Sequence, residues 1–158
     1  MTKIHVPDLP WTEQRSPKGK FARSFRRPSQ AMGSKPDTGT WGGGWPFELD
    51  QFRVPPGAIN YPFHSHSAQW EFYLVTQGTG EVRTPEGNTP IRAGDAFLTP
   101  PGEAHSVTNT GTEPLEFWVI SDNPIADDCH YPDSGKVAMT TLAKTFRPVF
   151  TEYYDGEE

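Results

Sequence analysis

The stretch PFHSHSAQWEFYLV, Pro62 to Val75, places two histidines two residues apart and one glutamate at the head of an apolar run. In a β-strand, side chains two residues apart share a face, so His64 and His66 are expected to point the same way. The same pattern directs Glu71 toward the core or a cavity. Buried carboxylates are almost always paired or bound to a metal, and the sequence offers no neighbouring Lys or Arg as a local partner. The stretch therefore predicts that these three side chains converge on a common target.

Short strands separated by turn residues continue on both sides of this stretch. The chain has 158 residues, the length of one ordinary domain, and its 17 Pro and 15 Gly suit tight turns better than long helices. Turn signals recur at short intervals, at residues 55–57, 78–80, 85–88, 100–103 and 110–114. This pattern predicts an all-β domain, either a sandwich or a small barrel. Helical periodicity is weak except in residues 137–146, which fit a helix and a strand equally well.

A second stretch, GDAFLTPPGEAHSVTN from Gly94 to Asn109, contains a further histidine behind a framework of Gly and Pro. His105, Val107 and Asn109 share one face of a strand, so His105 points inward if the strands curl around a common interior. A single inward histidine is more often a hydrogen-bonded core residue than a ligand. Three histidines that meet a buried glutamate instead suit one divalent transition metal, because imidazole binds Fe, Mn, Ni, Cu and Zn alike. One carboxylate offsets half of the charge and leaves open positions, which chemistry requires.

The two stretches resemble the two motifs of the cupin family. GAINYPFHSHSAQWEFYLVTQG, Gly57 to Gly78, has the Gly, His-x-His, Glu and Gly of the first motif, with six residues rather than the usual five before the first histidine. The second stretch has the Gly, Pro-x-Gly, His and Asn of the second motif. The resemblance implies a small antiparallel β-barrel, the double-stranded β-helix or jelly roll of cupins. It also implies a site for one divalent transition metal (Fe, Mn, Ni or Zn) with the ligands His64, His66, Glu71 and His105.

The chain is expected to divide into three parts. Residues 45–121 form the cupin barrel, residues 1–44 a Pro-rich basic N-terminal extension, and residues 122–158 a C-terminal excursion and tail packed on the barrel. Residues 1–40 hold eight Lys or Arg and three Asp or Glu, giving +5, whereas residues 41–158 hold six and seventeen, giving −11. A nucleic-acid arm is one interpretation of this contrast, but no recognition helix or stacking platform accompanies it. We expect no nucleic-acid partner, and an extension that lies on its own acidic domain or on a partner subunit.

The compartment and the assembly follow from simpler features. The chain has one cysteine, Cys129, no N-terminal apolar targeting segment and no apolar run of about 20 residues. We therefore expect a cytoplasmic protein with no membrane partner. The resemblance to cupins that pair through strand edges and N-terminal extensions, together with the basic extension and acidic domain, predicts a homodimer.

Function is less determined than fold, because cupins include dioxygenases, decarboxylases, isomerases, epimerases, sugar-binding proteins and storage proteins. One hypothesis is a small metal-dependent enzyme, a dioxygenase or a sugar-type isomerase, that acts on a small polar or anionic substrate in the barrel. The alternative is a non-catalytic domain that binds a sugar or an organic acid. An isomerase needs a base outside the metal ligands, and the candidate catalytic residues are Tyr73, His130 and Asp133. Arg53 would suit an anionic substrate.

A further cluster follows the last expected barrel strand. Asp127, Asp128, Cys129 and His130 mimic a second metal site, although the turn-rich sequence after them favours a plain loop. Residues 122–136 come directly after a barrel strand, so a lid over the barrel mouth is a second interpretation of the same segment.

The expected burial of Glu71 also predicts how its protonation changes when a metal binds. Burial disfavours its charge, so in the metal-free protein it should take up a proton or draw in a counter-ion. Metal binding should then release protons, and metal affinity should fall as the pH drops toward about 6.5.

Overall fold

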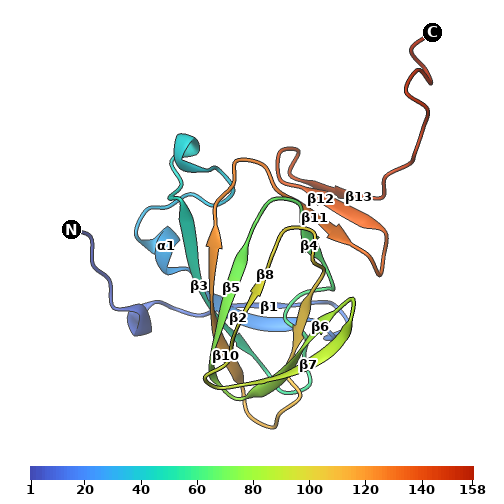
Figure 1. Cartoon of the computed structure of the whole chain (residues 1–158). Coiled ribbons are helices and arrows are strands. Elements are labelled where there is room, and N and C mark those ends of the chain that lie inside the picture. The colour runs from blue at the N-terminus through green and yellow to red at the C-terminus, as the bar shows by residue number, and fades with distance from the viewer.

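The computed structural model describes residues 1–158, and the chain is almost entirely β, which confirms the predicted fold class (Figure 1). The strands are β1 (Thr12–Arg15), β2 (Ala22–Arg26), β3 (Phe47–Val54), β4 (Ser65–His66), β5 (Glu71–Gln77), β6 (Thr79–Thr84), β7 (Gly87–Arg92), β8 (Ala96–Thr99), β9 (Ser106–Thr108), β10 (Leu115–Asp122), β11 (Asp128–Tyr131), β12 (Lys136–Met139) and β13 (Lys144–Phe146). The helical segments are η1 (Val6–Asp8), α1 (Pro28–Ala31) and η2 (Thr40–Gly42). None of them has the length and apolar character needed to span a membrane.

All pairs of these strands are antiparallel, and they form three sheets. The largest has the order β1-β2-β3-β10-β5-β8, and the others are β7-β6-β9 and β13-β12-β11-β4. In Figure 1 the long strands β3, β10, β5 and β8 stand side by side, with the hairpin β6–β7 and the strands β11 to β13 on the other side of the molecule. His64 and His105 exchange two backbone hydrogen bonds, of 3.1 and 2.7 Å, and so join the segment before β4 to the segment before β9.

The hydrophobic core follows the two-residue period of the strands. In β10, Leu115, Phe117 and Val119 are buried and alternate with more exposed residues. Phe117 stacks on Phe52 of β3, with ring centroids 5.6 Å apart, and its register partner on the other side is Val75 of β5. The apolar core therefore lies against the inner face of the largest sheet.

Gly78 lets the chain pass from β5 directly into β6. Its φ of +81° is a left-handed conformation that side chains other than Gly rarely adopt. A Cβ atom there would lie 2.6 Å from the carbonyl oxygen of Pro114, so both the backbone angle and the space require glycine. This turn brings the hairpin β6–β7 around to the other side of the barrel.

The N-terminal residues contribute two strands to the largest sheet. β1 and β2 form a hairpin, and β2 pairs with β3 so that Ser24 lies beside Arg53. The Arg53 side chain pairs with Glu116 at 2.8 Å and covers the ring of Trp11, so it is engaged outside the barrel. A boundary at residue 44 stays a prediction. What the structure adds is that residues 12–26 extend the barrel sheet.

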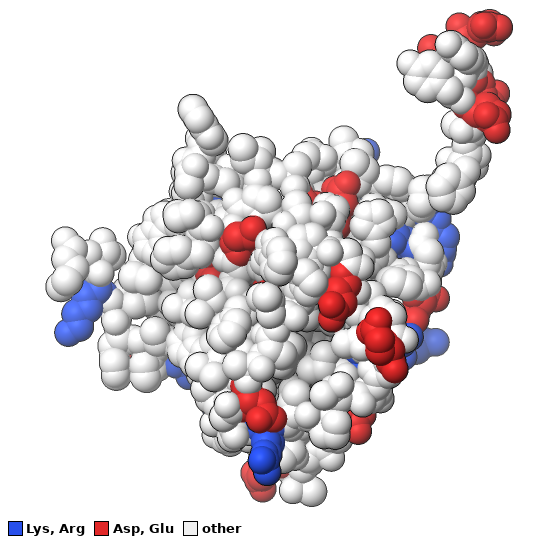
Figure 2. All heavy atoms as spheres, in the orientation of Figure 1, with Lys and Arg blue, Asp and Glu red and all other residues white.

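The C-terminal residues form strands where the sequence left two alternatives. Residues 137–146 contribute β12 and β13, so the strand interpretation is the observed one. Beyond them, residues 147–158 extend away from the body of the molecule (Figure 1). Figure 2 shows that the tip of this tail is acidic, and that the face in view carries scattered charges with no patch of Lys and Arg.

Candidate metal centre

The inner face of the largest sheet changes from polar to apolar along its strands. Register pairing sets Glu48 (β3), Ser121 (β10) and Glu71 (β5) in one row across the sheet. The next row contains Asp50, Val119 and Tyr73, and the third contains Phe52, Phe117 and Val75. A cavity of about 210 Å³ opens over the first two rows. Its remaining walls come from residues 27–37, from the segment around β4 and from β11.

The backbone bridge between His64 and His105 fixes the rings of both residues. The Nδ1 atom of His64 is 2.9 Å from the carbonyl oxygen of Pro62, and that of His105 is 3.2 Å from the carbonyl oxygen of Glu103. An Nδ1–H group that donates to a carbonyl leaves the Nε2 lone pair free to act as a ligand. The His105 Nε2 atom lies 2.9 Å from Glu71 Oε2, and two acceptors at that distance need a proton or a cation between them.

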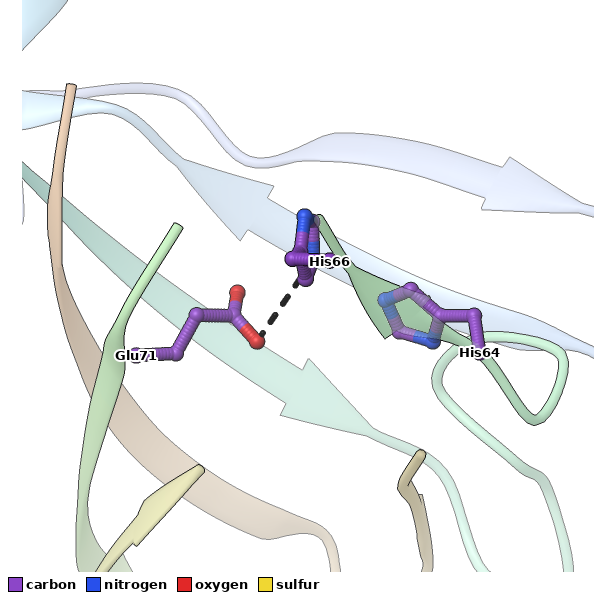
Figure 3. Close-up of side chains that lie close together, drawn as sticks. All are labelled: His64, His66 and Glu71. Carbon is purple, nitrogen blue, oxygen red and sulfur yellow. Dashed lines mark ion pairs between the residues drawn. The ribbon is translucent and has the colours of Figure 1, made fainter. Parts of the chain in front are cut away.

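His66 is oriented by a carboxylate on the far side of its ring. Its Nδ1 atom is 2.5 Å from Asp127 Oδ2, while Asp127 Oδ1 accepts the backbone N–H groups of Ala68 and Gln69 at 2.8 and 3.2 Å. The Nε2 atom of His66 is buried without a hydrogen-bond partner and lies 3.8 Å from Glu71 Oε2. In Figure 3 the rings of His64 and His66 lie on the same side of the Glu71 carboxylate, and the dashed line joins His66 to it.

The donor set fits a divalent transition metal. One ligand atom from each of His64, His66 and Glu71 lies within 4.8 Å of the others, and His105 adjoins Glu71. Imidazole nitrogen together with one carboxylate is the donor type that Fe, Mn, Ni and Zn accept. The unpartnered His66 Nε2 is the decisive atom, because a buried nitrogen without a partner is costly unless something binds it.

Comparison with known proteins places the barrel in a family. The family model of the cupin domain matches residues 51–121. These residues form a cupin domain. A curated relative, the oxalate-binding protein of Thermotoga maritima, is 36% identical over 70 residues, which are 44% of this chain and 57% of the relative. The alignment therefore spans little more than half of that protein.

Two solved structures resemble this chain over nearly its whole length. One is a protein of Acidithiobacillus ferrooxidans provisionally named a sugar phosphate isomerase, with a TM-score of 0.76, 21% identity and 96% coverage of both chains. The other is a sugar phosphate isomerase from a cupin superfamily, of Silicibacter pomeroyi, with a TM-score of 0.73 and 24% identity, covering 98% of this chain and 94% of that one. At these identities the likeness shows a shared fold.

Charges in the cupin site are arranged around an ionised Glu71. Burial acts to raise its pKa, but the hydrogen bond from His105 and the charges of the nearby histidines outweigh burial and lower it to about 2. The pKa of His64 falls to about 4, because of burial first and then the charges of His105 and His66. At neutral pH, Glu71 is therefore a carboxylate and His64 a neutral imidazole.

His66 is one of the positive charges near Glu71 in the metal-free protein, with its Nε2 atom 3.8 Å from Glu71 Oε2 and its Nδ1 atom bonded to Asp127. Burial acts to lower the pKa of His66, but the hydrogen bonds with Asp127 and Cys129 and the charge of Glu71 outweigh it and raise the pKa to about 11. Of the two alternatives expected for Glu71, a bound proton or a counter-ion, the arrangement supports the counter-ion. The proton that competes with a metal thus sits on His66.

Tyr73 lies at the site but is held protonated. Its hydroxyl donates to Glu71 Oε2 at 2.9 Å and lies 3.1 Å from His105 Nε2. Burial and the Glu71 charge raise its pKa well above the usual value. Tyr73 is therefore suited to orient Glu71 as a hydrogen-bond donor, and it is poorly suited to the role of base.

The other candidate bases do not reach the site. His130 is exposed, because β11 turns its neighbours Cys129 and Tyr131 toward the cavity and His130 outward. Asp133 is also exposed and forms two hydrogen bonds with Arg83, at 2.7 and 2.9 Å. Neither residue lines the cavity, so a role as base stays a prediction that this geometry does not support.

Asp127 has a role that sequence reasoning missed. The pairing of β11 with β4 sets Cys129 beside His66, which brings Asp127 to the far side of the His66 ring. His66, Asp127 and Cys129 also lie close enough to hold a metal, but Asp127 already occupies the Nδ1 atom of His66. In this arrangement the cluster supports His66, and Cys129 and Tyr131 of β11 line the cavity.

Proposed function

We propose that the cupin binds one divalent transition metal (Fe, Mn, Ni or Zn) through the Nε2 atoms of His64, His66 and His105 and the Glu71 carboxylate. The observation that carries this proposal is the buried, unpartnered His66 Nε2 atom beside Glu71. Asp127 holds the His66 ring from behind, an outer hydrogen bond typical of metal-binding histidines. The Nδ1 contacts of His64 and His105 with backbone carbonyls fix their rings in the same way.

We further propose that the cupin is an enzyme acting on a small oxygen-rich molecule in this cavity. When bound, a 2+ ion supplies Lewis-acid polarisation of a ligand oxygen atom. The side chains around it hold and shield the ligand: Tyr73 orients Glu71, and the third, apolar row of the sheet closes the cavity from below. The volume of about 210 Å³ is below the roughly 300 Å³ at which typical ligand pockets begin, so the substrate is small. Sugar-type isomerisation is the reaction to test first, and dioxygenation the second.

A binding protein without catalysis is the second candidate function. It is favoured by the curated relative, which is named an oxalate-binding protein and is 36% identical over the matched part. In that case the same side chains and metal would only fix the orientation of a small ligand.

Metal analysis of untagged protein separates these candidates. We expect about one transition-metal ion per chain, because the donor set forms a single group. Iron would favour oxygen chemistry, whereas zinc would exclude redox chemistry and leave isomerisation or binding. Conversion of small aldoses and ketoses, followed by NMR, then distinguishes an isomerase from a binding protein. Protein that takes up no Fe, Mn, Ni or Zn at neutral pH would contradict the proposal.

We also propose that the protein forms a homodimer. Phe72 and Leu74 of β5, Leu98 of β8 and Ile120 of β10 form an outer apolar patch on the largest sheet, each with 39 to 50% exposure. A Leu98→Asp substitution places a charge in this patch and should weaken the dimer at least about tenfold. Leu142→Asp is the matched control, because Leu142 is 56% exposed and lies in the turn between β12 and β13. Light scattering gives the mass, and a monomeric wild type at moderate concentration would refute the dimer.

A further inference from the structure

The cavity wall across the sheet from the metal ligands is built from two acidic residues of β3. Glu48 and Asp50 lie on the inner face, in the rows of Glu71 and Tyr73 and separated from them by β10. Two strand spacings correspond to about 10 Å between the backbones of β3 and β5. A small molecule in the cavity therefore lies between the candidate metal ligands and this acidic wall.

Both residues keep an oxygen atom without a partner. Glu48 is only 7% exposed, and its Oε1 atom accepts hydrogen bonds from Ser34 and Asn123, while its Oε2 atom is buried and unpartnered. Asp50 Oδ1 is likewise buried and unpartnered, and Asp50 Oδ2 lies 3.6 Å from Arg27 Nε. Buried carboxylate oxygens without donors are costly, so the wall lacks the hydrogen-bond donors that a ligand would bring.

The charges that line the cavity argue against an anionic ligand. Arg27 is the one Lys or Arg in the lining, against the four carboxylates of Asp37, Glu48, Asp50 and Glu71. A 2+ ion would offset only part of this negative charge. Oxalate or a phosphate group would meet repulsion at the wall, whereas an uncharged hydroxyl group would donate a hydrogen bond to it.

We propose that Glu48 and Asp50 form a hydroxyl-binding subsite, and that the cupin takes an uncharged polyhydroxylated molecule, a free sugar or polyol, in preference to oxalate or a sugar phosphate. The inference rests on the proposed function, because it names the ligand class of that same cavity. Asp50 suits this role in a second way. Burial, and then the charges of Glu48 and Glu71, raise its pKa to about 6 against the opposing effect of Arg27, so its charge is poorly stabilised and a ligand hydroxyl that donates to it would be favoured.

The test compares three ligands on the metal-loaded protein by calorimetry: D-ribose, D-ribose 5-phosphate and oxalate. The wild type should bind D-ribose most tightly. Glu48→Gln and Asp50→Asn should each weaken D-ribose binding about tenfold, because each replaces a charged acceptor by a neutral one. The same variants should bind oxalate more tightly than the wild type. Glu13→Gln, which removes one exposed carboxylate from β1, two strands away from β3 in the same sheet, should change neither affinity.

The subsite would be contradicted if the wild type bound oxalate or D-ribose 5-phosphate more tightly than D-ribose. It would also be contradicted if both variants had the same affinities as Glu13→Gln. A second bound metal ion that Glu48→Gln removes would be the third contradicting result. Asp50→Asn removes no side-chain hydrogen bond, only the 3.6 Å ion pair with Arg27, so it remains a usable variant if Glu48→Gln folds poorly. Metal content measured on the same samples separates the two proposals. Absence of metal contradicts the proposed function, whereas one ion per chain with the wrong ligand order contradicts only the subsite.

Discussion

Replacing His66 or His105 with Ala should reduce bound metal from about one ion per chain to well below one, while the barrel stays folded. Removing only the hydrogen-bond partner of a metal ligand typically weakens metal binding 10- to 100-fold, so removing the ligand itself should cost more than about 100-fold. The fold should persist because the hydrophobic core cluster of 12 residues contains neither histidine. Elemental analysis gives the metal content, and circular dichroism checks the fold.

His130→Ala is the matched control for these variants. It removes the same side chain from an exposed position on β11, outside the cavity, and should keep the full metal content. If His66→Ala or His105→Ala keeps as much metal as His130→Ala, the ligand assignment is wrong. His66→Ala is the safer of the two to interpret, because His105 is only 1% exposed and its removal leaves a larger gap in the barrel.

The two motifs were enough to predict most of the fold and the candidate metal ligands. Strands β5, β8 and β10 have the limits that their apolar runs predict, because Gly and Pro end each run sharply. The convergence of His64 and His105 depends on a single bridge between two segments of the barrel, which the resemblance to cupins implied. Local spacing placed His66 and Glu71 on β4 and β5, whereas the bridge between His64 and His105 came from the resemblance and not from the local pattern.

Residues far apart in the sequence were the ones that reasoning from the sequence could not place. Asp127 reaches His66 only because β11 pairs with β4, and no spacing along the chain indicates that pairing. The turn-rich sequence around His130 favours a loop, whereas the structure has the strand β11 there. In a strand, its neighbours Cys129 and Tyr131 take the inner face and His130 cannot share it.

The acidic wall was missed for a related reason. The sequence of β3 alternates only loosely, so the face that Arg53 occupies was left undecided. The register with β10 puts Arg53 beside Glu116 on the outside, and therefore Glu48 and Asp50 on the inside. Arg27 enters the cavity from the N-terminal segment, whose course depends on tertiary packing that no local pattern encodes.

Metal affinity should increase at least about tenfold for each unit of pH between about 6 and 8, with at least about one proton released per ion bound, because His66 must lose a proton and any proton that His105 Nε2 donates to Glu71 must leave as well. The direction of this pH dependence follows from the protonation states of the metal ligands. The pKa of Glu71 is lowered to about 2 and that of His64 to about 4. These two ligands therefore have no proton to lose in this pH range. His66, with its pKa raised to about 11, is protonated throughout and must give up its Nε2 proton to bind a metal. Lower pH therefore favours the proton over the metal.

The Asp127→Asn variant tests whether His66 supplies this proton. It removes the carboxylate whose hydrogen bond raises the His66 pKa, so that pKa should fall toward the usual value of about 6.5. At pH 8 the variant should then release about one proton fewer per ion than the wild type, and its affinity should change less between pH 7.5 and about 8.5. Calorimetric titration in two buffers of different ionisation enthalpy counts the protons for both proteins. A wild type whose affinity is independent of pH, with no proton released, would contradict a protonated His66 in the metal-free protein and the role of Asp127 in holding that proton.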